Sequence, residues 1–362
     1  MEHGSELKTK NSKLKAVFLI ALAVLATGLT GCGSETQTAL TVNGSAEINE
    51  EIFTYFLNYE YWSGGSSYDS EYISHATNDC LAYVTVNSAC RELGVRLNGA
   101  EKADCSRETN SLWRLYEDYL TELGISKNTF FKIKQYEYMK DALRFALYDT
   151  GGYQAIPEND LKAYFNGTYA GIKYYYESLY TVLPSETLAG MTAAQVENYN
   201  ASVAAANDRY ERLTRLATLV NSDQYTIDEA YMAATGDVNE GAGAKTAVLS
   251  ADSSSFTAEF INAVFSQQVG TTFIVTNADR SYIYFVERIG LFDDGDTLFN
   301  EYRDECLRGY SESFLTNEIN TRSAGFKAVR HTDVTDKCLE RVKKIDRSKY
   351  AGTEEFVFPE IG

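Results

Sequence analysis

The chain has 362 residues, of which 51 are acidic and 33 basic, so its formal net charge is −18. This acidity argues against nucleic acid as a partner, because phosphate binding requires clusters of Lys and Arg that the chain lacks. Hydrophobic residues make up 44% of the chain, which excludes wholesale disorder, and the length predicts two domains.

The N-terminus has the pattern of a secretion signal. Four lysines between residues 8 and 15 precede an apolar run over residues 17–26. This run is about ten residues long, which is too short to span a bilayer but typical of a signal peptide. We therefore expect residues 1–31 to be removed from the mature protein.

The apolar run ends in Leu29-Thr30-Gly31-Cys32, which resembles the lipobox of bacterial lipoproteins. The resemblance implies that Cys32 is lipidated and holds the chain on the extracytoplasmic face of the cell membrane. Residues 32–40 are then the lipidated N-terminus and a short tether. An ordinary signal peptide with an incidental cysteine is the alternative.

Residues 41–165 are predicted to be helical, because apolar residues recur at steps of three and four. Asn49 has the position of an N-terminal cap for the first helix, and Ser126 that of a cap for the fourth. The second helix is expected to stop near Gly94. The third is expected to end at Gly124, where a left-handed conformation favours glycine.

The pattern changes near residue 170. Alternating apolar residues from Ile172 to Leu183 predict a strand, and Thr192 starts a long helix. Two shorter helices and two strands follow, with Ala247-Val248-Leu249 as a candidate short strand. This order predicts a small α+β domain over residues 170–292. The turn at 293–296 lacks the spaced ligands of an EF-hand and is interpreted as a solvated turn.

The cysteines and histidines suggest neither a metal site nor a cofactor. The chain has only 3 histidines, and no cysteine pair has the CxxC spacing of a zinc site. Besides Cys32, five cysteines remain, an odd number that does not make a complete disulfide framework. A Cys90–Cys105 disulfide stays open as an alternative, but burial as small apolar side chains is the expected role. The five are Cys80, Cys90, Cys105, Cys306 and Cys338.

Three segments together resemble the PrsA/SurA family of extracytoplasmic foldases. The segment from Thr41 to Asn49, TVNGSAEIN, is similar to the start of the mature sequences of that family. The segment IPENDLKAYF at 156–165 lies where the family has a comparable segment. The stretch from Phe260 to Thr276 resembles the end of a parvulin-type prolyl isomerase domain. The resemblance covers nearly all of residues 41–322.

This resemblance implies an α+β protein in which a helical chaperone domain carries an inserted parvulin-like domain. The chaperone domain would comprise residues 41–165 and be completed by a helix at 296–322, and the insert would occupy residues 170–292. Residues 323–362, which show no clear pattern, would form a C-terminal tail. The implied partners are unfolded or nascent secreted polypeptides.

The sequence departs from active parvulins, which carry a histidine on the first strand of the domain and another on the last. No histidine occurs between His75 and His331, and no cysteine between Cys105 and Cys306. We therefore predict no catalytic residues and little or no isomerase activity. The domain would be retained for binding, with the client contacted by five aromatic residues: Tyr174, Tyr176, Phe260, Phe265 and Tyr284.

Other interpretations remain open. These aromatic residues are also what a packed core would contain, and a tyrosine hydroxyl could serve an active prolyl isomerase as a hydrogen-bond donor. A solute-binding or adhesive surface lipoprotein is a further alternative. A solute-binding protein would need two repeated α/β lobes, whereas the pattern indicates helices around one small sheet.

Overall fold

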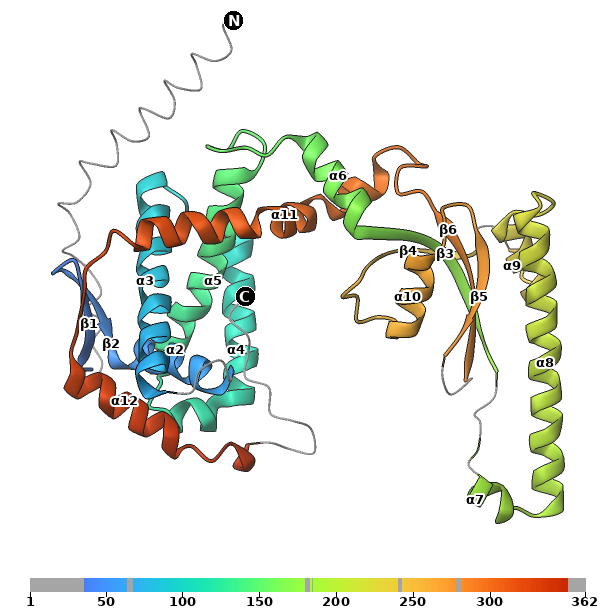
Figure 1. The fold of residues 1–362 in the computed structure, drawn as a ribbon, viewed down its shortest axis with the longest axis horizontal. Helices are drawn as coiled ribbons and strands as arrows, with labels where there is room; N and C mark the ends of the chain where they lie inside the picture. Colours follow the sequence, from blue (N-terminus) through green and yellow to red (C-terminus); the bar gives the residue numbers. More distant parts are fainter. Residues whose placement is uncertain are drawn as a thin grey trace, which may run out of the picture. The chain divides into compact units, whose positions relative to one another are not determined.

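A computed structural model describes residues 36–63, 68–179, 183, 185–239, 243–277 and 281–350. The predicted signal peptide and Cys32 lie outside the described residues. The chain forms two compact units (Figure 1). Unit 1 takes in Met1–Ala155 and Ser311–Gly362, and unit 2 is Ile156–Tyr310. Helices with two small antiparallel sheets make an α+β fold, as predicted.

Unit 1 is mainly helical and has a three-stranded sheet in the order β2-β1-β7. Its strands are β1 (Thr38–Val42), β2 (Ala46–Asn49) and β7 (Ala328–Arg330). Its helices are α2 (Glu50–Ser63), α3 (Asp69–Leu93), α4 (Gly99–Glu122), α5 (Lys127–Tyr148), α12 (Thr332–Lys344) and the second part of α11 (Thr297–Ser323). Over the described part of the chain, no helix is long and apolar enough to cross a membrane.

The predicted helix ends are confirmed in unit 1. The Asn49 side chain accepts a hydrogen bond from the N–H of Ile52 at 2.9 Å, and so caps α2. The Ser126 hydroxyl accepts from a main-chain N–H in the first turn of α5. Gly94 and Gly124 adopt φ values of 68° and 74°, the left-handed conformation that ends α3 and α4. These ends depend on local sequence, which is why they could be predicted.

The described part of 323–362, for which the sequence indicated no elements, is packed into unit 1. Strand β7 pairs with β1, and α12 buries Val334, Cys338, Leu339 and Val342. The expectation of helices from residue 41 onward was wrong at its start, because β1 and β2 form a hairpin there. Asn43 and Gly44 have positive φ values of 52° and 72°, as expected for an Asn-Gly hairpin turn.

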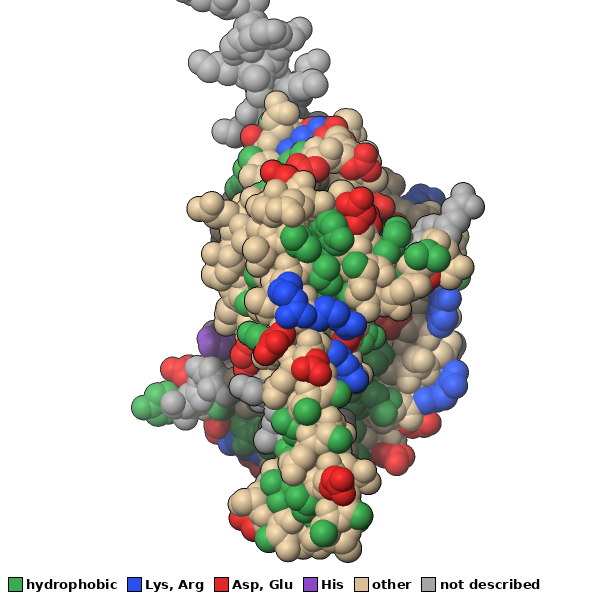
Figure 2. All heavy atoms as spheres, turned by 90° about the vertical axis from the view of Figure 1, so that its right-hand side faces the viewer, with side chains coloured by type: hydrophobic (Ala, Val, Ile, Leu, Met, Phe, Trp, Pro, Cys, Tyr) green, Lys and Arg blue, Asp and Glu red, His purple; other side chains and the backbone are tan. Residues whose placement is uncertain are grey.

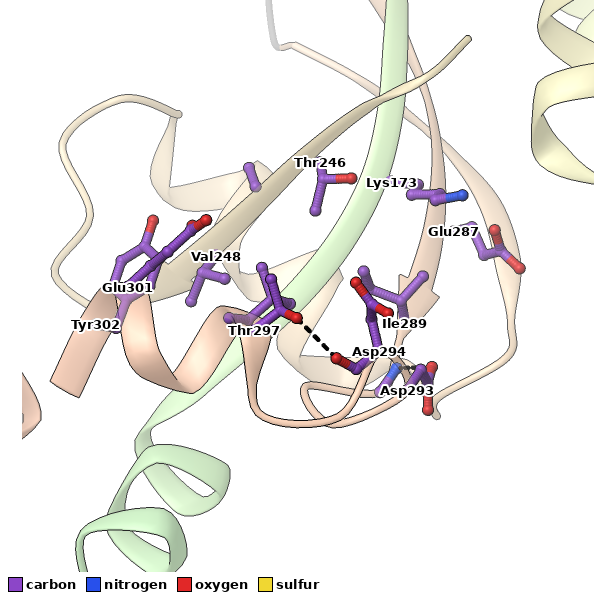
Figure 3. A pocket seen from close by; sticks show the side chains of 13 residues that line it. Lys173, Thr246, Val248, Glu287, Ile289, Asp293, Asp294, Thr297, Glu301 and Tyr302 are labelled. Carbon is purple, nitrogen blue, oxygen red and sulfur yellow. Dashed lines mark hydrogen bonds between the residues drawn. The ribbon is translucent and has the colours of Figure 1, made fainter. Parts of the chain in front are cut away.

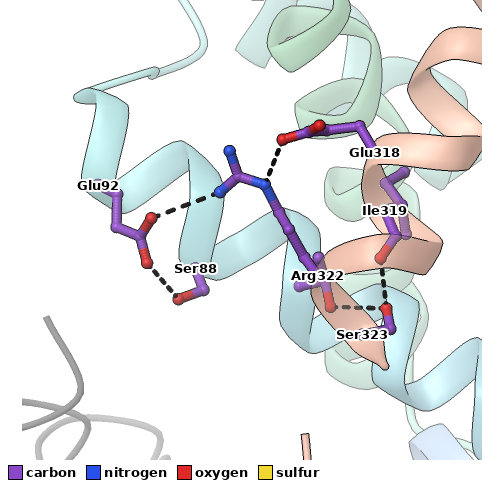
Figure 4. Close-up of polar contacts among 7 residues, drawn as sticks. Ser88, Glu92, Glu318, Ile319, Arg322 and Ser323 are labelled. Atoms are coloured by element: carbon purple, nitrogen blue, oxygen red, sulfur yellow. Dashed lines mark hydrogen bonds and ion pairs between the residues drawn. The ribbon is translucent and has the colours of Figure 1, made fainter. Parts of the chain in front are cut away.

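The second half of α11 is fixed to α3 by polar contacts (Figure 4). Arg322 Nε donates to Glu318 Oε1 at 2.7 Å, and its Nη1 lies 3.5 Å from Glu92 Oε2 on α3. One residue further on, the Ser323 hydroxyl lies 2.9 Å from that of Thr85. The Arg322 side chain is only 13% exposed, whereas the Glu92 side chain is 38% exposed, so the ion pair between them is partly open to water.

Unit 2 contains a four-stranded antiparallel sheet in the order β4-β3-β6-β5. Its strands are β3 (Tyr169–Ser178), β4 (Lys245–Ser250), β5 (Thr272–Thr276) and β6 (Tyr282–Ile289). Its helices are α6 (Glu158–Thr168), α7 (Ser185–Ala189), α8 (Ala193–Asn221), α9 (Ile227–Thr235), α10 (Ala258–Ser266) and the first part of α11. The predicted long helix and candidate short strand at 247–249 are confirmed as α8 and β4. The strand predicted from Ile172 to Leu183 is found as β3, which begins at Tyr169 and ends at Ser178.

Each face of this sheet has its own core. Tyr175, Ile283 and Phe285 pack under α8 and α9, whereas Ile172 and Val286 pack against α10. Neighbouring residues alternate between the faces because side chains in a strand have a period of two. Tyr174 and Tyr176 therefore share the α10 face with Ile172, as the sequence predicted. Tyr180 and Val182, predicted for the same side, lie outside the described residues.

Helix α8 packs on the sheet only through its second half. No residue from Ala193 to Ala205 is fully buried, whereas Leu213 and Val220 are. Basic side chains gather at mid-height of the face that α8 presents (Figure 2). One of the arginines of α8, Arg212, donates from a single nitrogen, Nη2, to both carboxylate oxygens of Glu177 near the end of β3, at 2.9 and 3.0 Å.

Candidate functional site

The α10 side of the unit 2 sheet carries a cluster of six aromatic residues, which we call the aromatic face. Strand register places two of them opposite each other, because Tyr176 of β3 pairs with Tyr284 of β6. A third, Phe256, lies just before Thr257, which caps α10. The six are Tyr174, Tyr176, Phe256, Phe260, Tyr282 and Tyr284.

The rings of the aromatic face are in continuous contact. The ring centroid of Tyr284 lies 4.9 Å from that of Phe260 and 5.7 Å from that of Tyr176. Phe256 stacks on Phe260 at 4.4 Å and meets Tyr174 edge-on at 5.3 Å. Aromatic pairs at these separations are favourable, and each contributes about 0.5–1.5 kcal/mol beyond the area it buries.

Exposure increases across the aromatic face from α10 toward the end of the strands. Phe260 is 2% exposed and belongs to the core, whereas Tyr176 is 48% and Tyr282 40% exposed. Tyr174 and Tyr284 are half-buried between them. The face thus has a buried base and an accessible aromatic rim, which is the form of a surface that binds apolar side chains.

Four of the five predicted contact residues lie together in this cluster, and Phe265 does not. Phe265 is 39% exposed on α10 and makes no ring contact with other described residues. Five residues advance an α-helix by about 500°, so Phe265 points about 140° away from Phe260.

Sequence reasoning missed Phe256 and Tyr282, although the sequence contains a signal for each. Tyr282 lies two residues before Tyr284 in the same strand and therefore shares its face. Phe256 immediately precedes the capping Thr257, a position where an apolar residue often packs on the first turn of the helix.

The aromatic face is chemically suited to contact rather than to proton transfer. Its six side chains contain no group that titrates near neutral pH, and burial raises the pKa of the Tyr284 hydroxyl further. Lys245 Nζ lies 5.8 Å from the ring centroid of Tyr176, where a cation interacts favourably with the ring. The face can therefore hold apolar groups and donate hydrogen bonds from tyrosine hydroxyls.

The cysteines take no part in this site. Cys80, Cys90, Cys105, Cys306 and Cys338 are all buried and free, so the Cys90–Cys105 disulfide is not formed. Burial raises the pKa of the Cys90 thiol to about 12, which keeps it protonated and unreactive. The described residues also contain no group of His, Cys, Asp or Glu placed to hold a metal ion.

The chain belongs by architecture to the proteins in which a helical unit is interrupted by a small α+β unit. No protein-family model and no curated protein matches its sequence. Among solved structures, it is similar to the foldase protein PrsA from Streptococcus pneumoniae, with 14% identity over 84% of this chain and 94% of that one. PrsA from Lactococcus lactis is 14% identical over 85% of this chain and 99% of that one.

A third similar structure, PrsA from Bacillus subtilis, is 12% identical over 76% of this chain and 86% of that one. The TM-scores are 0.33, 0.33 and 0.27 in the order given. These scores are too low to establish a common fold.

Proposed function

We propose that the protein is a lipid-anchored, extracytoplasmic chaperone of the foldase type that binds unfolded or nascent secreted polypeptides. The lipobox-like motif ending at Cys32 supports the anchor, and the three segments that resemble PrsA and SurA support the class. The observation that carries the binding role is the aromatic face, with Tyr176 and Tyr282 at its exposed rim.

Client binding is proposed to occur at the exposed rim of the aromatic face. An apolar or proline side chain of an extended client packs against Tyr176 and Tyr282, and a tyrosine hydroxyl donates to a client carbonyl. Tyrosine suits this role because it offers a large contact area while losing little conformational entropy. The net charge of −18 keeps the protein soluble while it holds an unfolded chain.

The binding role is tested by the double variant Tyr176→Ala/Tyr282→Ala. We expect it to lose at least fivefold in its capacity to suppress aggregation of an unfolded model protein, because it removes the accessible part of the aromatic face. Aggregation is followed by light scattering with residues 33–362, which include every described residue.

The matched control is Tyr210→Ala/Tyr225→Ala. These two tyrosines lie outside the aromatic face and are 48% and 39% exposed, against 48% and 40% for the test pair. The control should suppress aggregation as well as the unmodified chain. If the unmodified chain does not suppress aggregation at equimolar amounts, the proposed function is wrong. If the test pair performs like the control, the aromatic face is not the client site.

The parvulin-like domain is proposed to bind without catalysing prolyl isomerisation. The barrier to rotation is about 18–20 kcal/mol, and the aromatic face offers only tyrosine hydroxyls to lower it. We expect cis–trans exchange in a proline peptide, measured by NMR exchange spectroscopy, to proceed at the same rate with the protein as in buffer. A rate increase that disappears in Tyr176→Ala/Tyr282→Ala would instead favour an active isomerase.

A further inference from the structure

The sheet of unit 2 has a cavity of about 620 Å³ on the face opposite the aromatic face (Figure 3). Its base is formed by β3, β4 and β6, where Lys173 pairs with both Thr246 and Glu287. Lys173 follows Ile172 and precedes Tyr174, so strand alternation directs it away from α10. The turn at 290–296 and the start of α11 form the opposite wall.

Acidic side chains dominate the polar lining of this cavity. Four carboxylates line it, against one lysine. The lysine is already engaged, because Lys173 Nζ lies 3.4 Å from Asp228 Oδ2, and Asp293 accepts a hydrogen bond from the N–H of Gly290 at 2.7 Å. The other carboxylates have no side-chain partner among the described residues: Glu287, Asp294 and Glu301.

Burial and neighbouring carboxylates outweigh the one lysine close to Glu287. Desolvation is the main cause that raises its pKa; Lys173 opposes the rise, and Asp228 and Asp293 add to it. A cation entering the cavity would relieve this repulsion and replace the lost hydration. The cavity thus has electrostatic complementarity to a positively charged group.

The lining suits an extended organic cation better than a metal ion. Apolar side chains of Val248 and Ile289 lie between the acidic groups, and the ring of Tyr302 lies beside Glu301 at one end of the cavity (Figure 3). No three acidic groups of the described chain converge on one point, as a metal ion would require. An aliphatic stem ending in a cation can cover the apolar lining and still reach a carboxylate. Arginine and lysine side chains have this form.

The position of the cavity favours a peptide as the source of this cation. Strand β4 contributes Thr246 and Val248 to the lining and is the edge strand of its sheet, with only β3 paired to it among the described strands. An edge strand presents unpaired N–H and C=O groups, to which an extended segment can add as a further strand. A small cation has no peptide backbone and therefore cannot form hydrogen bonds to this edge strand.

We propose that this cavity binds an arginine or lysine side chain of an extended client segment, whose cation is held by the carboxylates that line the cavity, with Glu287 and Glu301 at its two ends. This inference rests on the proposed chaperone function and adds a preference for basic clients. It assigns the cavity a role separate from the aromatic face, which contacts apolar side chains.

The experiment compares two fluorescent nine-residue peptides that differ at one central residue, arginine or its neutral isostere citrulline. Binding to residues 33–362 is measured by anisotropy at 50 and 300 mM salt. We expect the arginine peptide to bind at least tenfold more tightly at low salt, and this preference to shrink at high salt. Glu287→Gln/Glu301→Gln should abolish the preference and leave citrulline-peptide binding unchanged.

A control of equal charge change is Glu197→Gln/Asp208→Asn, because both residues are exposed on α8 and lie outside the cavity lining. It should keep the preference, which separates a local site from the overall negative charge. Free arginine amide at the same concentration should displace the arginine peptide only weakly, since it cannot pair with β4 as an added strand. Unchanged discrimination in Glu287→Gln/Glu301→Gln, or equal loss in the control, would overturn the inference.

The result also separates this inference from the proposed function. If the chain suppresses aggregation but binds both peptides equally, the cavity role is wrong and the chaperone role stands. If it prefers the arginine peptide through these carboxylates but does not suppress aggregation, the cavity binds basic peptides and the chaperone proposal fails.

Discussion

Replacement of Lys134 by methionine is expected to lower the free energy of unfolding of unit 1 by about 3–5 kcal/mol at pH 8. Lys134 lies in α5 with its side chain 6% exposed, and its Nζ is 2.9 Å from Glu108 Oε1 on α4. It also forms an ion pair with Glu137, which is largely buried. Methionine fills the same space but leaves the Glu137 carboxylate without its cation.

The loss in Lys134→Met should be smaller at pH 5 than at pH 8. Burial raises the pKa of Glu137 even while Lys134 opposes the rise. Without the lysine, the carboxyl is protonated more readily, and a neutral carboxyl is less costly to bury. Acidification therefore offsets part of the destabilisation.

Urea unfolding followed by tryptophan fluorescence measures this effect in the right unit, because both tryptophans of the chain, Trp62 and Trp113, belong to unit 1. The control is Lys127→Met, which removes the same charge from an exposed position in the first turn of α5. It should change the free energy of unfolding by less than about 0.5 kcal/mol. Equal stabilities for the two variants would contradict the assignment of Lys134 as a buried ion-pair partner.

Asp79→Asn is expected to stabilise unit 1 by about 2–4 kcal/mol at pH 8 and by less than half as much at pH 5. Burial of Asp79 on α3, reinforced by the neighbouring Glu60, raises its pKa to about 7. Its Oδ2 is buried without a hydrogen-bond partner. The ionised carboxylate is thus poorly accommodated in the folded chain, and asparagine removes its charge while nearly keeping its shape.

The direction of this pH dependence follows from the number of protons bound in the folded and unfolded chains. An unfolded aspartate has a pKa of about 3.9, so between about pH 4 and 7 the folded chain binds more protons at Asp79 than the unfolded chain does. The contribution of Asp79 to stability therefore falls as the pH rises through this window, and the full penalty is present above pH 7. The same tryptophan-monitored urea unfolding at pH 5 and pH 8 measures the difference.

Asp118→Asn is the control for this prediction, because Asp118 is exposed on α4. It should alter stability by less than about 0.5 kcal/mol at both pH values. A loss of stability in Asp79→Asn at pH 8, or an equal gain at both pH values, would show that Asp79 is not held in an unfavourable ionised state.

The parts of the fold that could be predicted are those coded by neighbouring residues. Asn49 and Ser126 mark helix starts through side chains that bond within one turn, and the alternation from Ile172 to Tyr176 marks β3. Strand β7 could not be predicted, because three residues form a strand there only by pairing with β1, almost 290 positions earlier. Its own three side chains are all exposed and leave no apolar pattern.

The aromatic face and the acidic cavity also differ in how far the sequence alone could reveal them. Tyr176 and Tyr284 could be placed on one face from strand alternation alone. The acidic cavity could not be found, because Glu287 on β6 and Glu301 on α11 come together only through the packing of α11 beside the sheet. Likewise, nothing near Lys134 in the sequence identifies Glu108, which contributes to its ion pair from another helix.

The pairing of β1 with β7 implies an order of folding during synthesis. The N–H of His331 donates to the carbonyl of Ala39 at 2.9 Å, so unit 1 joins the beginning of the described chain to its end. Residues 156–310 of unit 2, by contrast, are continuous in sequence. Because the chain is synthesised from its N-terminus, it can complete unit 2 before the last strand and helix of unit 1 are available. Unit 1, although it contains the first residues of the described chain, is thus the last unit that can be completed.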